Sequence, residues 1–344
     1  MRPRRHGFHH GVGVTLLVGK VGGDDDGGGR GTSLGPLTGP SMIVGRERWV
    51  RPRDTSKGAA VSLSTLRAAS TVPAVGATPF GPFTMRWAEV GPENAPRVLL
   101  LHGIYAGAHS YEWRRLAPLL STEHRVRTPD LLGTGESDRP EMEYGPEIVQ
   151  GAVEALIRDA GASAHVVASS LTGAYALRAA ASGVPMASLT LITPTGLRAR
   201  SDEDRADRSS LPYHLFARTP LGDALVWALT SSPSVSWFER HKTYRDPQFL
   251  TGDELRETRR AGRERGARHL QLAFLFGRLS VELDPSEVER VRPTVVWGAG
   301  QGFTSDKEQL RWREVGAKVH QVDSGLPQVE EPGRLMGLLA FSGT

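Results

Sequence analysis

The sequence contains no cysteine, and none of its hydrophobic runs approaches the roughly 18 residues needed to cross a bilayer. The first absence excludes disulfides, thiolate metal sites and a cysteine nucleophile. The second argues against a transmembrane helix. Residues 11–19 follow several arginines, as in a signal peptide, but they are short, broken by glycine and lack a small-residue cleavage site. We therefore expect a cytoplasmic protein with no membrane partner.

Most of the chain also lacks an excess of either charge. The formal net charge is +4, but residues 1–54 hold nine Lys and Arg against five Asp and Glu, and the rest of the chain holds 33 of each sign. A balanced composition does not indicate a surface for a polyanion, so no nucleic-acid partner is expected. No metal or other cofactor is expected, and the oligomeric state is left open.

The pattern of the chain divides it into four segments. Residues 1–70 are glycine-rich or basic without periodicity and are predicted to be disordered or weakly ordered, with Met42 as an alternative start. Strand and helix patterns alternate over residues 71–196 and again over 290–344, whereas residues 197–289 show helical patterns only. This order predicts an α/β fold, a mostly parallel doubly wound sheet with an inserted helical cap.

Individual strands follow from apolar runs bounded by turn residues. Residues 83–90 and 97–101 are predicted to pair as a hairpin, because a turn-forming Gly-Pro-Glu-Asn separates them. The second of these runs is apolar enough to be buried on both faces of a sheet. Further strands are expected at 125–128, 165–168, 189–193, 294–297 and 318–322, and helices at 111–120, 147–160, 171–182, 221–229, 252–266, 270–279, 305–314 and from about 332.

Residues 166–177, with the sequence VVASSLTGAYAL, indicate a strand, a tight turn and a helix. Such a turn exposes the hydroxyl of its middle residue, Ser170, beside a helix N-terminus. The G-x-S-x-G signature is altered, because Ala168 and Thr172 stand where glycines would let the backbone turn without a clash. Ser170 is nevertheless the position where chemistry is expected.

Two further motifs accompany this serine. His102-Gly103 follows a buried strand, and residues 129–138 read PDLLGTGESD. In this order, the three motifs resemble the oxyanion loop, the PDxxGxGxSD loop and the serine elbow of the α/β-hydrolase fold, and the resemblance runs from about residue 83 to the end.

The resemblance also implies roles for individual residues. The backbone N–H groups of Ile104 and Leu171 would form the oxyanion hole, and two such donors stabilise a developing negative charge by several kcal/mol, on the order of 3. Substrate contacts are expected from His102, Gly103 and Tyr105.

A serine hydrolase also needs a histidine base and a carboxylate that orients it. At the positions where the family carries these groups, this chain has Gln301 for the acid and Gly325 for the histidine. The alternative acid position, after residue 193, holds no carboxylate either. By position, His109 is the most plausible substitute base. The remaining histidines outside the tail are not singled out by any motif.

The loss of base and acid together favours chemistry without an acyl-enzyme. Residues 169–171, 297–304 and 324–332 resemble a triad-degenerate subgroup that includes the acetate-eliminating enzymes of spirotetronate antibiotic biosynthesis. That resemblance implies a lyase of secondary metabolism that removes acetate from an O-acylated, tetronate-like polyketide. Ser170 would then donate a hydrogen bond instead of attacking.

Two alternatives remain open at this point. One is a serine esterase or related hydrolase with a displaced base such as His109. The other is a catalytically inactive protein that binds a small acylated ligand. The sequence determines neither the substrate nor the general base.

Overall fold

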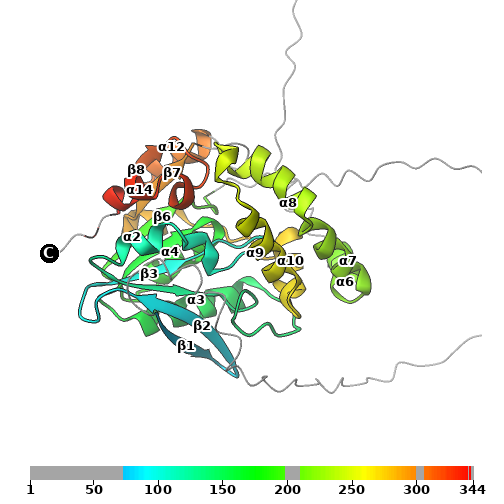
Figure 1. Cartoon of the computed structure of the whole chain (residues 1–344). Coiled ribbons are helices and arrows are strands. Elements are labelled where there is room, and N and C mark those ends of the chain that lie inside the picture. The colour runs from blue at the N-terminus through cyan, green and yellow to red at the C-terminus, as the bar shows by residue number, and fades with distance from the viewer. Residues whose placement is uncertain (1–72, 198–209, 300–305, 340, 342–344) are drawn as a thin grey trace, which may run out of the picture. The chain divides into compact units, whose positions relative to one another are not determined.

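The computed structural model describes residues 73–197, 210–299, 306–339 and 341 (Figure 1). The predicted N-terminal segment, residues 1–70, lies outside this range, and so does Gln301. Among the described residues, no helix is both long and apolar enough to cross a membrane.

The centre of the structure is an eight-stranded sheet with the order β1-β2-β4-β3-β5-β6-β7-β8. The pairs β1–β2 and β2–β4 are antiparallel, and all other neighbours are parallel. The strand bounds are β1 Ala74–Phe80, β2 Phe83–Val90, β3 Arg97–Leu101, β4 Arg125–Pro129, β5 His165–Ser169, β6 Ser188–Ile192, β7 Thr294–Gly298 and β8 Lys318–Val322. The predicted mostly parallel α/β sheet is thus confirmed.

The predicted hairpin between β2 and β3 is wrong. β4 lies between these strands, antiparallel to β2 and parallel to β3. Gly91, after β2, has a φ of 101°, and a Cβ there would lie 1.9 Å from the carbonyl oxygen of His124. The turn therefore packs against the residue that leads into β4. The real hairpin joins β1 to β2 through Gly81, where φ is 58°.

Alternate residues of the central strands face two separate hydrophobic clusters. Leu99 and Leu101 of β3 face the cluster that includes α3 (Pro146–Ala160) and α4 (Ser170–Ala181). Val98 and Leu100 face the other cluster, which includes α2 (Leu116–Leu120) and α14 (Pro332–Leu338). β3 is therefore buried on both faces, and helices cover both sides of the sheet.

The described part of the segment between β6 and β7 contains helices and no strand, and Figure 1 shows the cap helices grouped beside the sheet. After Leu275 the chain returns to the sheet domain: the Tyr175 hydroxyl donates to Leu279 O at 2.7 Å, and Leu283 N–H donates to Gly196 O at 2.8 Å. α11 (Pro285–Val291) then packs against α4. The cap elements are α6 Ser210–Ala217, α7 Pro220–Leu229, α8 Ser232–Phe238, the π-helical turn η3 Glu239–Thr243, η4 Pro247–Phe249, α9 Gly252–Arg263 and α10 Ala267–Leu275. 

A buried carboxylate holds the loops after β3 and β4 together. Asp130 accepts hydrogen bonds from the N–H groups of Ser110 and Glu136, both at 2.7 Å. Burial by itself would raise the pKa of Asp130, but the neighbouring imidazoles of His109 and His102 and these two hydrogen bonds lower it below its ordinary value. The carboxyl ends of β3 and β4 are thereby fixed relative to each other.

We expect Asp130→Asn to reduce the free energy of unfolding by about 2 kcal/mol at pH 7, since hydrogen bonds to a charged group contribute about 1.5–3 kcal/mol and an amide nitrogen cannot accept from an N–H. Because the pKa is lowered in the folded state, this stabilisation is present above the unfolded pKa and is lost as the pH falls. Urea unfolding at pH 7 and in acid measures both effects. The exposed Glu123→Gln serves as the control, and equal stability of the two variants at pH 7 would contradict the prediction.

Candidate active site

Ser170 lies at a strained turn between β5 and α4. Its φ is 53°, in the left-handed region that non-glycine residues rarely adopt. A sharp strand-to-helix turn of this kind is what presents a serine at the edge of such a sheet. Thr172 fits in place of a glycine because its hydroxyl donates a 2.7 Å hydrogen bond to His102 O. The elbow geometry is therefore retained without the two glycines.

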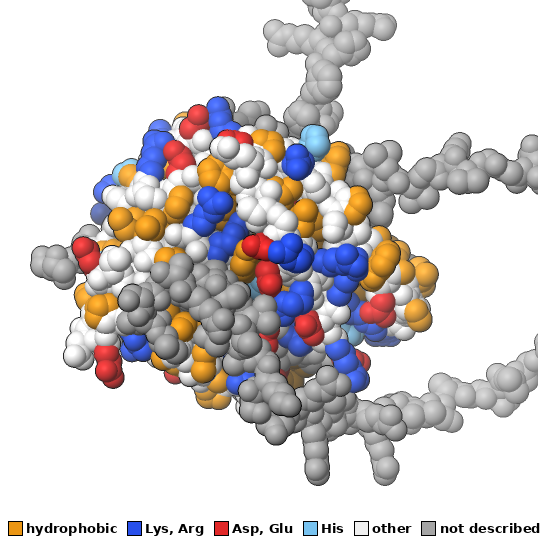
Figure 2. All heavy atoms as spheres, viewed as in Figure 1, with side chains coloured by type: hydrophobic (Ala, Val, Ile, Leu, Met, Phe, Trp, Pro, Cys, Tyr) orange, Lys and Arg blue, Asp and Glu red, His pale blue; other side chains and the backbone are white. Residues whose placement is uncertain are grey.

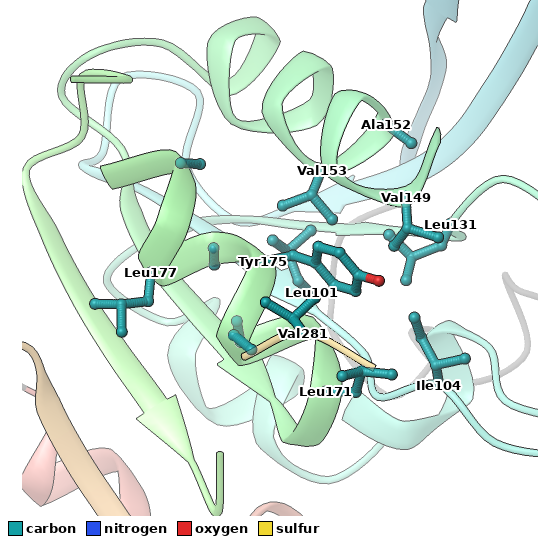
Figure 3. Packing of buried hydrophobic residues seen from close by; sticks show 14 of the residues in the cluster. Leu101, Ile104, Leu131, Val149, Ala152, Val153, Leu171, Tyr175, Leu177 and Val281 are labelled. Atoms are coloured by element: carbon teal, nitrogen blue, oxygen red, sulfur yellow. The ribbon is translucent and has the colours of Figure 1, made fainter. Parts of the chain in front are cut away.

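The loop after β3 lies directly against this serine. A Cβ added to Gly103 would be 3.4 Å from Ser170 Cβ. Ile104 and Leu171 are buried in the same hydrophobic cluster (Figure 3). The N–H of Leu171 is in the first turn of α4, where backbone donors have no intrahelical acceptor. The N–H of Ile104 makes no hydrogen bond within the described residues. Both donors are thus available to an oxyanion, and their role stays a prediction.

His102 connects two loops. Its Nδ1–H donates to Gly103 O at 2.7 Å, and its Nε2 accepts from the N–H of Leu131 at 3.1 Å. The ring is fully buried, and this burial lowers the pKa of His102, which favours the neutral form that these two bonds require. Because both nitrogens are engaged, the His102 side chain offers no free nitrogen to a substrate.

His109, the predicted substitute base, faces the cap. Its Nδ1 lies 3.0 Å from Gly107 O, and its Nε2 lies 3.6 Å from Oε2 of Glu257 in α9. The pKa of Glu257 is lowered, chiefly by this contact with His109. No hydrogen bond joins Ser170 Oγ to His109 or to any other described residue. The structure therefore does not pair this histidine with the serine.

The main chain of the cap packs against Gly325, the position predicted for the histidine. A Cβ at Gly325 would lie 1.7 Å from the carbonyl oxygen of Thr243, at the end of η3. The carboxylate of Glu330 holds this contact in place, since it accepts from the N–H groups of Gly325 at 2.6 Å and Asp246 at 2.9 Å. No residue larger than glycine fits here without displacing the cap.

A buried polar network that the sequence did not predict lies behind the oxyanion loop. Glu112, in the 3-10 turn η2 (Ser110–Trp113), accepts from Gly103 N–H at 3.0 Å and from the Tyr105 hydroxyl at 3.4 Å. Its other oxygen accepts from Gln328 Nε2 at 2.8 Å. Gln328 belongs to α13 (Pro327–Glu330) and also reaches Ser169 Oγ at 3.5 Å. The network therefore positions both Gly103 and the elbow.

The sequence held a weak signal for this network. Glu112 is an acidic residue within the predicted helix 111–120, and Gln328 lies inside the last motif of the family resemblance. Neither pattern shows that the two side chains meet, because they are separated by 216 positions and come together only through packing.

More carboxyl groups face this region from the cap. Glu254 pairs with Arg114 at 2.9 Å and accepts a hydrogen bond from the Tyr244 hydroxyl. Glu239 is also buried, and its Oε2 has no hydrogen-bond partner. Burial, reinforced by the charge of Glu254, raises the pKa of Glu239 to about 8. Glu239 is therefore largely protonated at neutral pH.

Comparison with known proteins places these features in a family. The model of the family described as "Alpha/beta hydrolase family" matches residues 98–336. A haloalkane dehalogenase of Bradyrhizobium diazoefficiens is 35% identical over 99 residues, which are 28% of this chain and 31% of that protein. A 2-hydroxy-6-oxo-6-(2'-aminophenyl)hexa-2,4-dienoic acid hydrolase of Metapseudomonas resinovorans is 40% identical over 60 residues, 17% of this chain and 20% of that protein. The matched region thus spans less than a third of these curated relatives.

Solved structures agree on the fold. The 2-hydroxy-6-oxo-6-phenylhexa-2,4-dienoate hydrolase from Rhodococcus sp. strain RHA1 superimposes with a TM-score of 0.61 at 19% identity, over 78% of this chain and 97% of that one. The epoxide hydrolase CorEH superimposes with a TM-score of 0.57 at 18% identity, over 77% and 96% of the two chains. At these identities the likeness shows the fold alone, and it confirms the α/β-hydrolase fold predicted from the sequence.

We expect Gly325→Ala to destabilise the protein by about 1–3 kcal/mol, the usual cost of overpacking, because the new methyl group meets the Thr243 carbonyl. Gly333→Ala is the matched control, since nothing lies within 4 Å of a Cβ at that position in α14. Thermal or urea unfolding compares the two variants. If Gly325→Ala is as stable as Gly333→Ala, the cap segment is not seated on Gly325.

The raised pKa of Glu239 predicts a loss of stability as the pH rises. Below pH 4.5 the carboxyl is protonated in both states; between about 4.5 and 8 it ionises only in the unfolded chain, so unfolding becomes easier. The effect approaches a factor of about 10 in the folding equilibrium per pH unit. Glu239→Gln should remove this component, and its stability relative to wild type should increase with pH. Urea unfolding at several pH values measures this difference, with the exposed Glu289→Gln as the control. Parallel curves of unfolding free energy against pH for Glu239→Gln and wild type would contradict the prediction.

Proposed function

The chain belongs to the alpha/beta hydrolase family, and we propose that it is an enzyme of this family that works without an acyl-serine intermediate. The reaction we propose is elimination of a carboxylate from an O-acylated small molecule. The one observation that supports this proposal most directly is the packing of the Thr243 carbonyl against Gly325, the position predicted for the histidine. A serine hydroxyl is a poor nucleophile without a base, and Ser170 Oγ has no described hydrogen-bond partner.

The groups that remain suit an elimination. In this reaction a base removes a proton from the carbon next to the acyloxy-bearing carbon, the alkyl–oxygen bond breaks, a carbon–carbon double bond forms and the carboxylate leaves. It requires stabilisation of the developing negative charge but no nucleophile. The N–H groups of Ile104 and Leu171 would supply that stabilisation. Ser170 would orient the substrate through a hydrogen bond.

The substrate class rests on the sequence resemblance, which points to an acetylated, tetronate-like polyketide. The cap arginines add little support for an anionic substrate, because acidic side chains already engage several of them. Arg260 contacts Glu257 at 3.1 Å, and Arg268 contacts Asp223 at 2.6 Å. Figure 2 accordingly shows basic and acidic side chains interspersed over α9. A cavity of about 310 Å³ in the cap is likewise lined by residues of both signs.

Ester hydrolysis is the second candidate, and the conformation of Ser170 favours it. A φ of 53° is strain that a purely structural serine would not need. Several relatives are named as hydrolases or dehalogenases. For this reaction the base would have to come from a position other than 325.

Labelled water separates the two candidates. With an O-acetylated tetronate in ¹⁸O-water, elimination releases acetate without label because the acyl–oxygen bonds stay intact. We also expect Ser170→Ala to keep its rate within about tenfold of wild type, the range expected when only an orienting hydrogen bond is lost. Acetate carrying ¹⁸O, together with a fall of about 10³-fold or more in Ser170→Ala, would instead identify acyl hydrolysis through the serine.

A further inference from the structure

Glu239 is on the same turn of the cap that fills the histidine position. The π-helical turn η3 begins at Glu239 and ends at Thr243, whose carbonyl lies against Gly325. Single π-helical turns inside helical segments occur frequently at functional sites. One local feature of the backbone therefore removes the space for a histidine and brings a carboxyl group into the interior.

The carboxyl of Glu239 is buried but not fully bonded. The residue is 9% exposed, and its Oε2 makes no hydrogen bond. Buried polar atoms are nearly always partnered, so an unpartnered oxygen at this depth requires an explanation, of which a catalytic role is one. Within η3, the side chain of Thr243 favours the charged form of Glu239 through a hydrogen bond, whereas Arg240, His241 and Lys242 are exposed.

The other charged and titratable groups around Glu239 come from four elements. Arg114 and Glu112 belong to the segment of η2, Glu254 to α9 and Tyr244 to the chain after η3. Tyr105, from the oxyanion loop, has its pKa raised by burial first and then by the charges of Glu112 and Glu239, so it stays a neutral phenol. Arg114 is already paired with Glu254. The positive charge of Arg114 therefore acts on Glu254 as well as on Glu239.

These surroundings link Glu239 to the serine. Glu112 and Tyr105 both interact electrostatically with Glu239. The Tyr105 hydroxyl donates a hydrogen bond to Glu112, and Glu112 also accepts one from the N–H of Gly103 at 3.0 Å. Gly103 in turn lies against Ser170. Glu112 accepts three hydrogen bonds and Glu254 forms an ion pair with Arg114, so both carboxylates already have partners within the protein. Oε2 of Glu254 has an ion pair but no hydrogen bond, whereas Oε2 of Glu239 has neither within the described residues.

We propose that Glu239 is the base that removes the substrate proton, an inference that rests on the elimination proposed above. One oxygen of the ionised carboxyl takes the proton from carbon, the electrons of that bond form the double bond, and the alkyl–oxygen bond breaks to release the carboxylate. The proton on Glu239 then passes to water. A pKa near 8 makes the ionised form a stronger base than an ordinary carboxylate, and also requires alkaline conditions for full ionisation.

The test uses the full chain and an O-acetylated tetronate in ¹⁸O-water, with kcat and KM measured from pH 6 to pH 10. For the wild type we expect kcat to rise with pH and level off above about pH 8, following ionisation of Glu239. Glu239→Gln should lower kcat about 10²-fold or more with little change in KM, the usual loss when a general base is removed. Glu239→Asp should recover part of the rate together with a pH-dependent rise.

Glu289→Gln, on the exposed side of α11, is the matched control and should behave as wild type. Unlabelled acetate formed by Glu239→Gln at the wild-type rate and with the wild-type pH profile would overturn the assignment of Glu239 and leave the elimination standing. If the wild type releases ¹⁸O-labelled acetate, or releases no acetate, the proposed elimination is wrong, and so is the assignment of Glu239 as its base. Unfolding curves of the Gln and Asp variants show whether a lost rate reflects lost folding.

Discussion

The contact between Thr243 O and the α-carbon of Gly325 is the constraint on which the site depends. Glu330 stabilises this contact, because its two carboxylate oxygens accept hydrogen bonds from the N–H groups of Gly325 and Asp246. Such charge-assisted bonds are strong enough to keep a cap segment seated on the sheet domain. Since the backbone of the cap occupies this space, a larger side chain at Gly325, the position predicted for the histidine, would require the cap segment to move.

Around this contact, hydrogen bonds connect the loops of the candidate site. His102 and Asp130 join the loops that follow β3 and β4, and Thr172 ties the elbow to the first of these loops. Ser170 keeps its left-handed backbone. The loops with the N–H groups predicted to bind an oxyanion are thus positioned by a set of hydrogen bonds, while no described residue makes a hydrogen bond to Ser170 Oγ. Preorganised donors of this kind stabilise charge in several types of reaction, not only acyl transfer.

The sequence predicted those elements whose signal is local. The strand, turn and helix around Ser170 were found because a β-branched run, small turn residues and a helical period follow one another directly. The predicted pairing of β2 with β3 was wrong because a turn signal marks the end of a strand without identifying its partner, and β4 comes between them. β1 was missed although Gly81 provides its hairpin turn. His109 was selected by its distance from the loop along the chain, whereas its ring faces α9.

By itself, the sequence predicted the strand, turn and helix around Ser170 and located a glycine where the family motif would have a histidine, because both predictions follow from residue identity within short motifs. Only the tertiary structure decided what occupies the histidine space and which carboxyl groups approach the site. Long stretches of chain separate Glu112, Gln328 and the cap turn with Glu239. No periodicity or spacing in the sequence predicts that these groups lie close together. Their proximity, and the raised pKa of Glu239 that results from burial, arise when the cap packs onto the sheet.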